Sequence, residues 1–458
     1  MSLLQKTVGI DDIATYVPKI YLDAGDMARA RGTPPEKLTK GLGIEKLSIP
    51  DAHEDAVTMA AMAALKLMEK NDLQPKDIDF IHVATETGPD ASKPISCYVQ
   101  GMLELRYGNG SFDHIGAPET KFACVGATYA MIDRLAYIVS GWNKAPYSIV
   151  VATDIAKYEL NSSGEPTQGA AAIALLLKED PRLLVYEPQF TGFGTVDDRD
   201  FFRPVERTTA VVNGQYSIGC YLRDMRIATD SYRKNMVKAG VLKSPVESLA
   251  NKIDLASFHS PYPKMVQYAF ASFLIHDWRN LPKWSQIAQK IGPEPSREKL
   301  TDVEFYISEG YKYYRKNFTN TEEFKKEYEA KVADSLKAIS AIGNSYTASV
   351  WLGVASHFET RKDDLTGKRI GIGSYGSGSS AIVCSFMVQP EYKDVIKKIK
   401  LIYKLNKRQK IPVNVYEYLH EGRRKLNESI NPPKEEFALD SIGTSETDLG
   451  YRYYKYVD

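Results

Sequence analysis

The sequence predicts an α/β protein made of two related halves. Two short runs rich in β-branched and aromatic residues, 78–87 and 147–153, flank an apolar helical segment, and this alternation is typical of a parallel sheet. A similar series of segments follows in the second half of the chain. The chain has 458 residues, whereas single cores rarely grow beyond about 250 to 300 residues. We therefore expect an N-terminal half at 1–200 and a C-terminal half at 201–458.

The first half is predicted to begin with a packed surface helix at 55–70. A turn at Asp-Leu-Gln-Pro separates this helix from the buried strand at 78–87. The segment TKFACVGATYAM, 120–131, then leads into an apolar helix, and YSIVVAT forms the strand at 147–153. The apolar positions of the first helix recur at helical spacing: Val57, Ala60, Ala61, Ala64, Leu65 and Met68.

The second half repeats this plan. A strand is expected at 253–263, a helix opened by small residues at 341–358, and a glycine-rich strand pair at 369–386. The distance from Cys124 to Asp154 is 30 residues, and so is the distance from Asn344 to Ser374. This weak self-similarity favours a duplicated α/β unit.

Two charged segments differ in character from the rest of the chain. Residues 285–340 have a charged helical pattern, which predicts an exposed helical insert with ion pairs between successive turns. Residues 393–410, KDVIKKIKLIYKLNKRQK, form a basic amphipathic stretch. A solvated helix face is the favoured interpretation of this stretch, and an anionic partner such as coenzyme A is the alternative.

The composition excludes several classes of protein. Hydrophobic residues make up 43% of the chain, charged residues 26%, and the net charge is +1, which is typical of a globular protein and favours neither nucleic acid nor membrane as a partner. We find no secretory or transit signal and no apolar run of about 18 residues, so we expect a cytoplasmic protein. The cysteines are scattered, which argues against a metal site and against disulfides: Cys97, Cys124, Cys220 and Cys384.

Cys124 is a candidate nucleophile because of its position. Small residues surround it, and it lies at the expected start of a helix, where the helix dipole and free amides lower the pKa of a thiol. The residue type alone favours the alternative, because an unpaired cysteine is more often a small buried hydrophobe. The sequence leaves both interpretations open.

Two ionisable residues end the matching first strands of the two halves. Glu86 lies where a strand meets a Gly-Pro loop, and burial there would raise the pKa of its carboxyl into the range useful for a general base. A loop-bracing carboxylate is the alternative. His259 ends the corresponding strand of the second half, although a lone histidine is more often structural. Asn344 could simply cap its helix, and the loop 374–380 could be a tight turn or a source of backbone amides for an oxyanion.

Ten segments together resemble 3-hydroxy-3-methylglutaryl-CoA (HMG-CoA) synthase, a family of thiolase-like condensing enzymes. They run in the family's order over nearly the whole chain: VGIDDIATYVP, HVATETGPDASKP, FACVGATYAM, VVATDIAKY, EPTQGAAAIALL, DFFRPV, NGQYSIGCYL, FHSPYPKM, GNSYTASVW and RIGIGSYGSGSSA. The resemblance implies a thiolase-like fold of duplicated α/β halves in five layers, α-β-α-β-α, and a homodimer.

The resemblance also implies the reaction and the roles of individual residues. It implies that acetyl-CoA and acetoacetyl-CoA condense to HMG-CoA for isoprenoid (mevalonate) synthesis, with no cofactor. Cys124 matches the nucleophile that takes the acetyl group, Glu86 the acid-base residue, and His259 the residue that polarises the acetoacetyl carbonyl. Further matches fall in motifs that contact substrate or line the pocket: Asp154, Thr167, Asp200, Phe201, Ser217, Asn344, Ser374 and Ser377. Lys264 matches a contact to coenzyme A.

Two departures from the family pattern leave alternatives open. Tyr268 stands where the family often has a second lysine for coenzyme A, and Val125-Gly126-Ala127 differs from the usual residues after the cysteine. A missing phosphate contact would suit a related synthase that takes acyl groups from an acyl carrier protein and makes β-branches in polyketides. A third hypothesis is a non-catalytic scaffold of the same fold, which the complete set of Glu86, Cys124 and His259 argues against.

Overall fold

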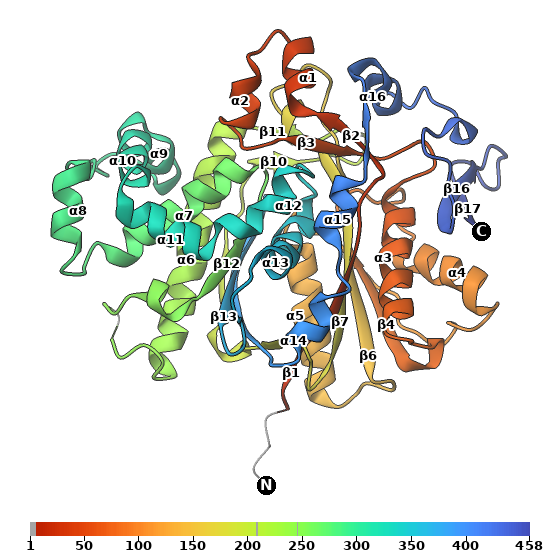
Figure 1. Cartoon of the computed structure of the whole chain (residues 1–458), viewed down its shortest axis with the longest axis horizontal. Coiled ribbons are helices and arrows are strands. Elements are labelled where there is room, and N and C mark those ends of the chain that lie inside the picture. Colours follow the sequence, from red (N-terminus) through yellow and green to blue (C-terminus); the bar gives the residue numbers. More distant parts are fainter. Residues whose placement is uncertain (1–5, 208, 245) are drawn as a thin grey trace.

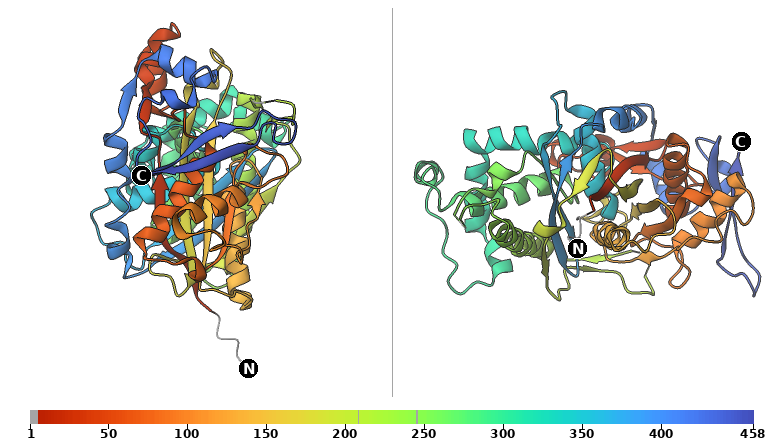
Figure 2. Two further views of the ribbon diagram at one scale, coloured as in Figure 1. Left: turned by 90° about the vertical axis from the view of Figure 1, so that its right-hand side faces the viewer. Right: turned by 90° about the horizontal axis from the view of Figure 1, so that it is seen from below.

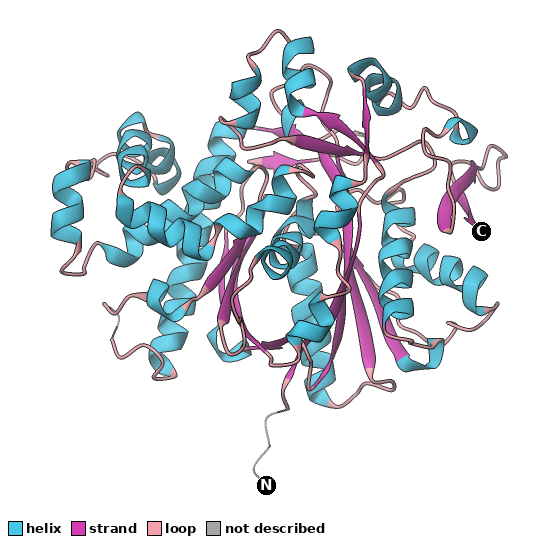
Figure 3. Ribbon diagram, in the orientation of Figure 1, coloured by secondary structure: helices cyan, strands magenta, loops and turns pink. Residues whose placement is uncertain are grey.

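A mixed sheet of ten strands runs through the whole molecule (Figures 1 and 3). The computed structural model describes residues 6–458 except residues 208 and 245. The sheet order is β12 (Leu255–Phe258), β13 (Arg369–Gly376), β14 (Ser380–Val388), β8 (Leu184–Tyr186), β1 (Val8–Tyr16), β7 (Gly169–Glu179), β6 (Tyr147–Ala156), β4 (Ile78–Ala84) and β5 (Glu119–Thr120), with β9 (Gly192–Thr195) paired to β14.

The predicted parallel sheet is correct only in part. The neighbours β4 and β6 are parallel, as are β12 and β13. In contrast, β7 pairs antiparallel with both β1 and β6, and β13 pairs antiparallel with β14. Only residues 377–379 connect β13 to β14. A connection of that length permits only a hairpin, because parallel neighbours need a crossover of a dozen or more residues.

Helices cover both faces of the N-terminal part of the sheet. The helices α3 (Ala56–Lys70) and α4 (Ile95–Tyr107) share one core with Ile149 and Val151 of β6, whereas α5 (Gly126–Ser140) shares another core with the alternate residues of the same strand. Because successive side chains of a strand point to opposite faces, α5 lies on the face opposite α3 and α4.

The C-terminal part of the sheet is enclosed in the same way. On one face, Trp351 of α13 (Ser349–Thr360) packs against Phe386 of β14, with ring centroids 5.9 Å apart. On the other face, the Tyr232 hydroxyl of α6 (Gly214–Lys238) donates to Ser385. Since α5 and α13 lie in one core, the expected five-layer order is confirmed, although β8 joins the two β layers into one sheet.

The charged insert is helical, as predicted, but it is not merely exposed. Its helices are α8 (Trp284–Ile291), α9 (Asp302–Ile307), α10 (Glu309–Thr319), α11 (Glu322–Lys331) and α12 (Leu336–Ser340). They bury aromatic side chains against α6 and α7 (Pro263–Trp278), including Phe305, Tyr311, Phe318 and Phe324. The insert and the C-terminal hairpin lie at opposite ends of the molecule (Figure 2).

The remaining elements lie around this frame. They are α1 (Ala24–Ala30), α2 (Pro35–Thr39), β2 (Ile20–Asp23), β3 (Lys46–Ile49), β10 (Phe201–Phe202), β11 (Val211–Val212), α14 (Tyr392–Ile396), α15 (Leu401–Asn406), β15 (Gln409–Ile411), α16 (Val413–His420), β16 (Glu436–Ile442) and β17 (Arg452–Val457). Within the described part of the chain, none of the helices combines the length and the apolar character needed to cross a membrane.

Candidate active site

Cys124 lies in a tight turn directly before α5. Ala123 has a φ of 38°, a left-handed conformation that is uncommon for a residue with a side chain and that clusters at functional sites. The Cys124 side chain is buried, with 7% of its surface exposed, in a small cluster with Tyr158, Phe201 and Tyr346. The turn therefore presents the sulfur to an enclosed, largely aromatic space.

Glu86 lies two residues beyond the end of β4, and one of its two carboxylate oxygens is fully buried. Its Oε1 is fully buried and has no hydrogen-bond partner among the residues that the structure describes. Its main chain is fixed on both sides, because its N–H donates to Asp154 Oδ1 at 2.9 Å and its carbonyl accepts from Arg203 Nη2 at 2.6 Å. A carboxylate oxygen that no protein group hydrogen-bonds is available to accept a proton.

Asp154, the neighbouring carboxylate, is fully buried but accepts several hydrogen bonds. Its Oδ1 accepts from the hydroxyls of Thr85 and Thr87 at 2.9 and 2.8 Å, and its Oδ2 accepts from the Thr347 N–H at 3.2 Å. Burial still raises the pKa of Asp154 to about 7, while burial and the Asp154 carboxylate raise the pKa of Glu86 well above its usual range. Four hydrogen-bond donors stabilise the Asp154 anion and none contacts Glu86 Oε1, so the pKa of Glu86 is raised more strongly than that of Asp154. The predicted rise in the pKa of Glu86 is confirmed.

The predicted low pKa of Cys124 is wrong. Burial raises the pKa of the thiol well above its usual value, and the carboxylates of Glu86, Asp154 and Asp200 raise it further. The first-turn amide of Ala127 donates to Thr347 Oγ1 at 2.8 Å and is not free to stabilise a thiolate. The thiol is therefore neutral in the free protein and loses its proton only as it reacts.

His259 follows β12 and is fixed by Ser349. Its Nδ1 lies 2.8 Å from Ser349 Oγ, which also accepts from the Ser260 N–H at 3.2 Å. In the tautomer in which the Ser349 hydroxyl donates to Nδ1, the ring proton is on Nε2. Burial lowers the pKa of His259 to about 3, so the ring is a neutral hydrogen-bond donor.

The segment 344–349 connects these groups. Thr347 binds both Asp154 and the first turn of α5, and Ser349 binds His259. Asn344 is buried, and its Oδ1 accepts from the Tyr346 N–H at 2.8 Å while Tyr346 takes a φ of 44°. The structure thus brings Glu86, Asp154, Cys124 and Asn344 together, with His259 tied to them through Ser349.

A second network surrounds Asp200. Its Oδ2 accepts from the hydroxyls of Ser217 and Tyr375 at 2.9 and 2.8 Å, and its Oδ1 accepts from the Gly378 N–H at 2.8 Å. Phe201 packs against Tyr346 with ring centroids 6.0 Å apart. Three of the predicted pocket residues therefore lie on one side of Cys124.

Of the other predicted site residues, Ser374 contacts α5, whereas the side chains of Thr167 and Lys264 contact residues of their own turn and helix. Ser374 is fully buried and accepts from the Thr128 hydroxyl of α5 at 3.0 Å, and Ser377 is half-buried in the turn that follows β13. The Thr167 hydroxyl instead donates to the Gly164 carbonyl of its own turn at 2.8 Å. Lys264 lies in the first turn of α7, with its Nζ 5.9 Å from the centroid of the Tyr268 ring.

Sequence reasoning missed four side chains of this site. Tyr158 and Tyr346 pack around the sulfur, Thr347 holds Asp154, and Ser349 holds His259. All four fall inside the motifs VVATDIAKY and GNSYTASVW, so the motifs marked the right segments. Their roles depend on contacts between segments that are far apart in the chain.

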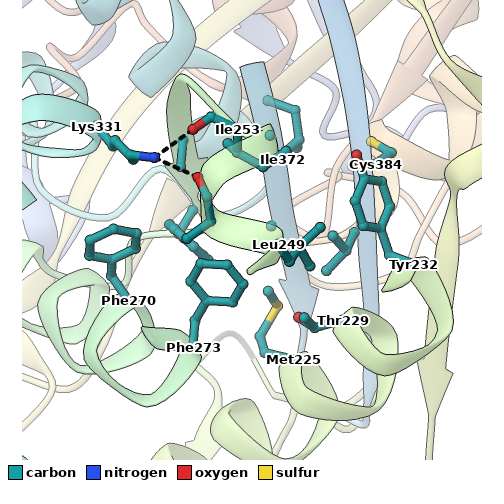
Figure 4. A pocket seen from close by; sticks show the side chains of 16 residues that line it. Met225, Thr229, Tyr232, Leu249, Ile253, Phe270, Phe273, Lys331, Ile372 and Cys384 are labelled. Carbon is teal, nitrogen blue, oxygen red and sulfur yellow. Dashed lines mark hydrogen bonds between the residues drawn. The ribbon is translucent and has the colours of Figure 1, made fainter. Parts of the chain in front are cut away.

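A separate apolar cavity lies on the other face of β13. Its volume is about 40 Å³, and it is lined by Met225 and Tyr232 of α6, Phe273 of α7, and Gly373 (Figure 4). Ser374, the next residue of β13, points the opposite way, toward α5. The cavity is therefore not the space around Cys124. Among the described residues, no group of three or more His, Cys, Asp or Glu side chains is arranged to hold a metal ion.

Comparison with family models gives two matches. The model described as "Hydroxymethylglutaryl-coenzyme A synthase N terminal" matches residues 4–181, and the model for the C terminal of the same enzyme matches residues 184–443. A hydroxymethylglutaryl-CoA synthase of Haloferax volcanii is 34% identical over 465 residues, which cover 99% of this chain and 100% of the relative. That of Saccharomyces cerevisiae is 29% identical over 411 residues, which cover 88% and 79%.

Solved structures agree with these matches. The structure titled MvaS in complex with 3-hydroxy-3-methylglutaryl coenzyme A has a TM-score of 0.85 and 33% identity, and the match covers 99% of this chain and 100% of the other. An HMG-CoA synthase complexed with CoA has a TM-score of 0.74 and 29% identity, with coverage of 98% and 100%. The HMG synthase of the curacin pathway has a TM-score of 0.77 but only 21% identity, over 99% of this chain and 100% of that one, which shows the fold alone.

Proposed function

Because the chain belongs to the hydroxymethylglutaryl-CoA synthase family, we propose that Cys124, Glu86 and His259 carry the condensation of acetyl-CoA with acetoacetyl-CoA to HMG-CoA. The protein is thus an acyltransferase that forms a carbon–carbon bond. The observation that carries the residue assignment is the buried, unpartnered Glu86 Oε1 beside a buried cysteine, with a neutral histidine fixed by Ser349.

The first step is transfer of the acetyl group to sulfur. The Cys124 sulfur attacks the acetyl carbonyl, the new sulfur–carbon bond forms, and the bond to the coenzyme A sulfur breaks. The proton of the neutral thiol ends on the departing coenzyme A sulfur. Since the carboxylates around Cys124 disfavour a free thiolate, the thiol loses its proton as the new bond forms.

The second step forms the carbon–carbon bond. The Glu86 carboxylate removes a proton from the methyl group of the acetyl-cysteine, and the resulting carbanion attacks the ketone carbon of acetoacetyl-CoA. The His259 Nε2–H donates a hydrogen bond to the developing alkoxide, which then takes the proton from Glu86. The raised pKa of Glu86 makes its ionised form a stronger base.

The third step is hydrolysis. Water attacks the acyl carbon on Cys124, a carbon–oxygen bond forms and the bond from this carbon to the Cys124 sulfur breaks. The hydroxyl of water becomes part of the product's carboxyl group, and its other proton returns to the thiol. The product of these steps, HMG-CoA, feeds isoprenoid (mevalonate) synthesis.

The pocket around these groups belongs to the same proposal. Asp154 positions the Glu86 loop, and Asn344 and Ser374 are assigned substrate contacts on the resemblance of their motifs. On the resemblance of their motifs, the following residues are assigned to the lining of the substrate pocket or to contacts with the substrate: Thr167, Asp200, Phe201, Ser217 and Ser377. Lys264 would contact coenzyme A, and the titles of two similar structures, which name HMG-CoA and CoA as their ligands, support a coenzyme A thioester as substrate.

The carrier-dependent synthase is less favoured. Relatives of the curacin and PksG type are 20–21% identical to this chain, against 33–34% for MvaS and the Haloferax enzyme. An acyl carrier protein remains a partner to test, by comparing acetylation of Cys124 from acetyl-CoA and from an acetylated carrier protein. The scaffold hypothesis requires that neither donor acetylates Cys124.

The assembly and location of the protein are also proposals. We infer a cytoplasmic homodimer from the resemblance. Large apolar side chains stand exposed between residues 193 and 212, and a second copy of the chain would cover them: Phe193, Phe202, Val205 and Val212.

The test of the proposed function is formation of HMG-CoA from acetyl-CoA and acetoacetyl-CoA. Wild-type protein is compared with Glu86→Ala, while acetylation of Cys124 is followed separately. We expect the variant to acetylate at a rate close to wild type but to condense at least about a hundredfold more slowly, because general base catalysis contributes about 10² to 10⁴. Equal condensation by the variant would show that Glu86 is not the base.

A further inference from the structure

Three basic side chains gather at the start of α7, where the insert packs against it. The Arg315 Cζ of α10 lies 4.0 Å from the centroid of the Tyr268 ring, and Lys264 Nζ lies 5.9 Å from the same centroid. Lys316 is the next residue of α10, and burial lowers the pKa of Lys264 most, followed by the charges of Arg315 and Lys316. Arg315 is 4% exposed, Lys264 is half-buried and Lys316 is exposed, so the cluster extends from the core to the surface.

The positive charge of this cluster is not compensated. Arg315 Nη1 is buried without a hydrogen-bond partner among the described residues, and no carboxylate acts on the charge of Arg315 or Lys264 there. Burial lowers the pKa of Arg315, and only tyrosines act in the opposite direction. A buried charge without a partner is costly, so the site favours an anion.

Another arginine of the insert shows the usual arrangement. The Arg297 Cζ lies 3.9 Å from the centroid of the Phe305 ring, a contact of the same kind as that of Arg315. Arg297 also pairs with Asp302 at 3.1 Å. The lack of a carboxylate beside Arg315 is thus a property of its location and not of arginines in this insert.

The cluster lies close to the candidate active site along the chain. Lys264 follows His259 by five residues, so their Cα atoms are at most about 18 Å apart. Lys264 also lies in the first turn of α7, a helix of 16 residues, where the helix dipole adds to the positive potential. A thioester that reaches Cys124 through a long arm could place an anionic group here.

We propose that Arg315 and Lys316, together with Lys264, bind the phosphates at the nucleotide end of acetyl-CoA. This inference rests on the proposed function. Arg315 stacks on Tyr268, the residue that replaces the second lysine of the family pattern, and supplies from the insert a positive charge at that place. The tyrosine at position 268 then does not favour a carrier-borne substrate, because α10 supplies the contact to the phosphates that the second lysine of the family pattern would make.

The experiment compares two acetyl donors that differ in their phosphates. The rate of Cys124 acetylation is measured against the concentration of acetyl-CoA and of acetyl-pantetheine, which has no phosphate. The proteins are wild type, Arg315→Met and the matched control Arg297→Met. For Arg315→Met we expect the half-saturating concentration of acetyl-CoA to rise about tenfold and that of acetyl-pantetheine to stay unchanged. Arg297→Met should change neither.

Two further variants keep the proposal testable if Arg315→Met does not fold. Lys316 is exposed, so Lys316→Met should fold normally, and we expect it to raise the half-saturating concentration of acetyl-CoA about threefold without affecting acetyl-pantetheine. Arg315→Lys keeps the charge and should retain most of the preference for acetyl-CoA. Equal effects on both donors, or no effect on either, would overturn the phosphate site. Failure of both donors to acetylate wild-type Cys124 would instead overturn the proposed function.

Discussion

At the scale of single residues, the site depends on the different surroundings of two neighbouring carboxylates. Asp154 accepts four hydrogen bonds, whereas Glu86 Oε1 is buried without one. The pKa of Glu86 is therefore raised more strongly than that of Asp154. His259 contributes no charge near neutral pH, because burial lowers its pKa to about 3.

The buried Glu86 predicts a pH-dependent effect on stability. A carboxyl whose pKa is raised in the folded state destabilises that state increasingly as pH rises above the pKa of the unfolded chain, about 4.3. Glu86→Gln removes this penalty, so we expect the variant to melt at a higher temperature than wild type. The difference should grow from about pH 5 to about pH 8, to 1 °C or more.

Thermal unfolding of both proteins at several pH values tests this expectation. The control is Glu435→Gln. Glu435 is exposed, so ionising its carboxyl costs the folded state little free energy. A Glu86→Gln variant less stable than wild type at about pH 8, or a difference independent of pH, would contradict the assignment of an uncompensated carboxyl.

At the scale of elements, the site depends on close contacts between strand β13 and the Cys124 turn. A Cβ atom placed on Gly376 would lie 2.7 Å from Val125 Cγ1, 2.8 Å from Val125 N and 3.0 Å from the Phe122 carbonyl oxygen. Two of these atoms belong to the main chain and cannot move without moving the turn. Glycine is therefore needed at 376 to let the turn approach the strand.

Gly376→Ala is expected to displace Cys124. We expect acetylation from acetyl-CoA to fall at least about tenfold, since a displacement of about 1 Å can cost a hundredfold in rate. The matched control is Gly101→Ala in α4, where a Cβ atom would meet nothing within 4 Å. Wild-type acetylation by a folded Gly376→Ala variant would show that the contact does not position the sulfur.

The sequence was sufficient to predict most elements but not how they pair. The helix at 55–70 and the strands that precede Glu86 and His259 were predicted from local periodicity, which depends on nearby residues. The antiparallel pairing of β6 with β7 and the raised pKa of Cys124 were not predicted, because both depend on segments far apart in the chain. Cys124 and Glu86 could be predicted as site residues because the motifs that contain them are specific to the family.

At the scale of the whole molecule, the two parts of the sheet each supply one side of the site. Glu86 follows β4 in the N-terminal part, His259 follows β12 in the C-terminal part, and the start of α5 contacts the segment that leads into α13. Segment 344–349 joins the two sides through hydrogen bonds to both. The division of the chain at residue 200 stays a prediction.

The most direct test of the central claim is mass spectrometry of the protein quenched after mixing with acetyl-CoA. Wild type, Glu86→Gln and His259→Asn are treated in the same way, and acetoacetyl-CoA is then added. We predict one acetyl group on Cys124 in all three proteins, followed by rapid conversion to product only in wild type. An acetyl group on another residue, or equally rapid conversion in all three proteins, would contradict the account.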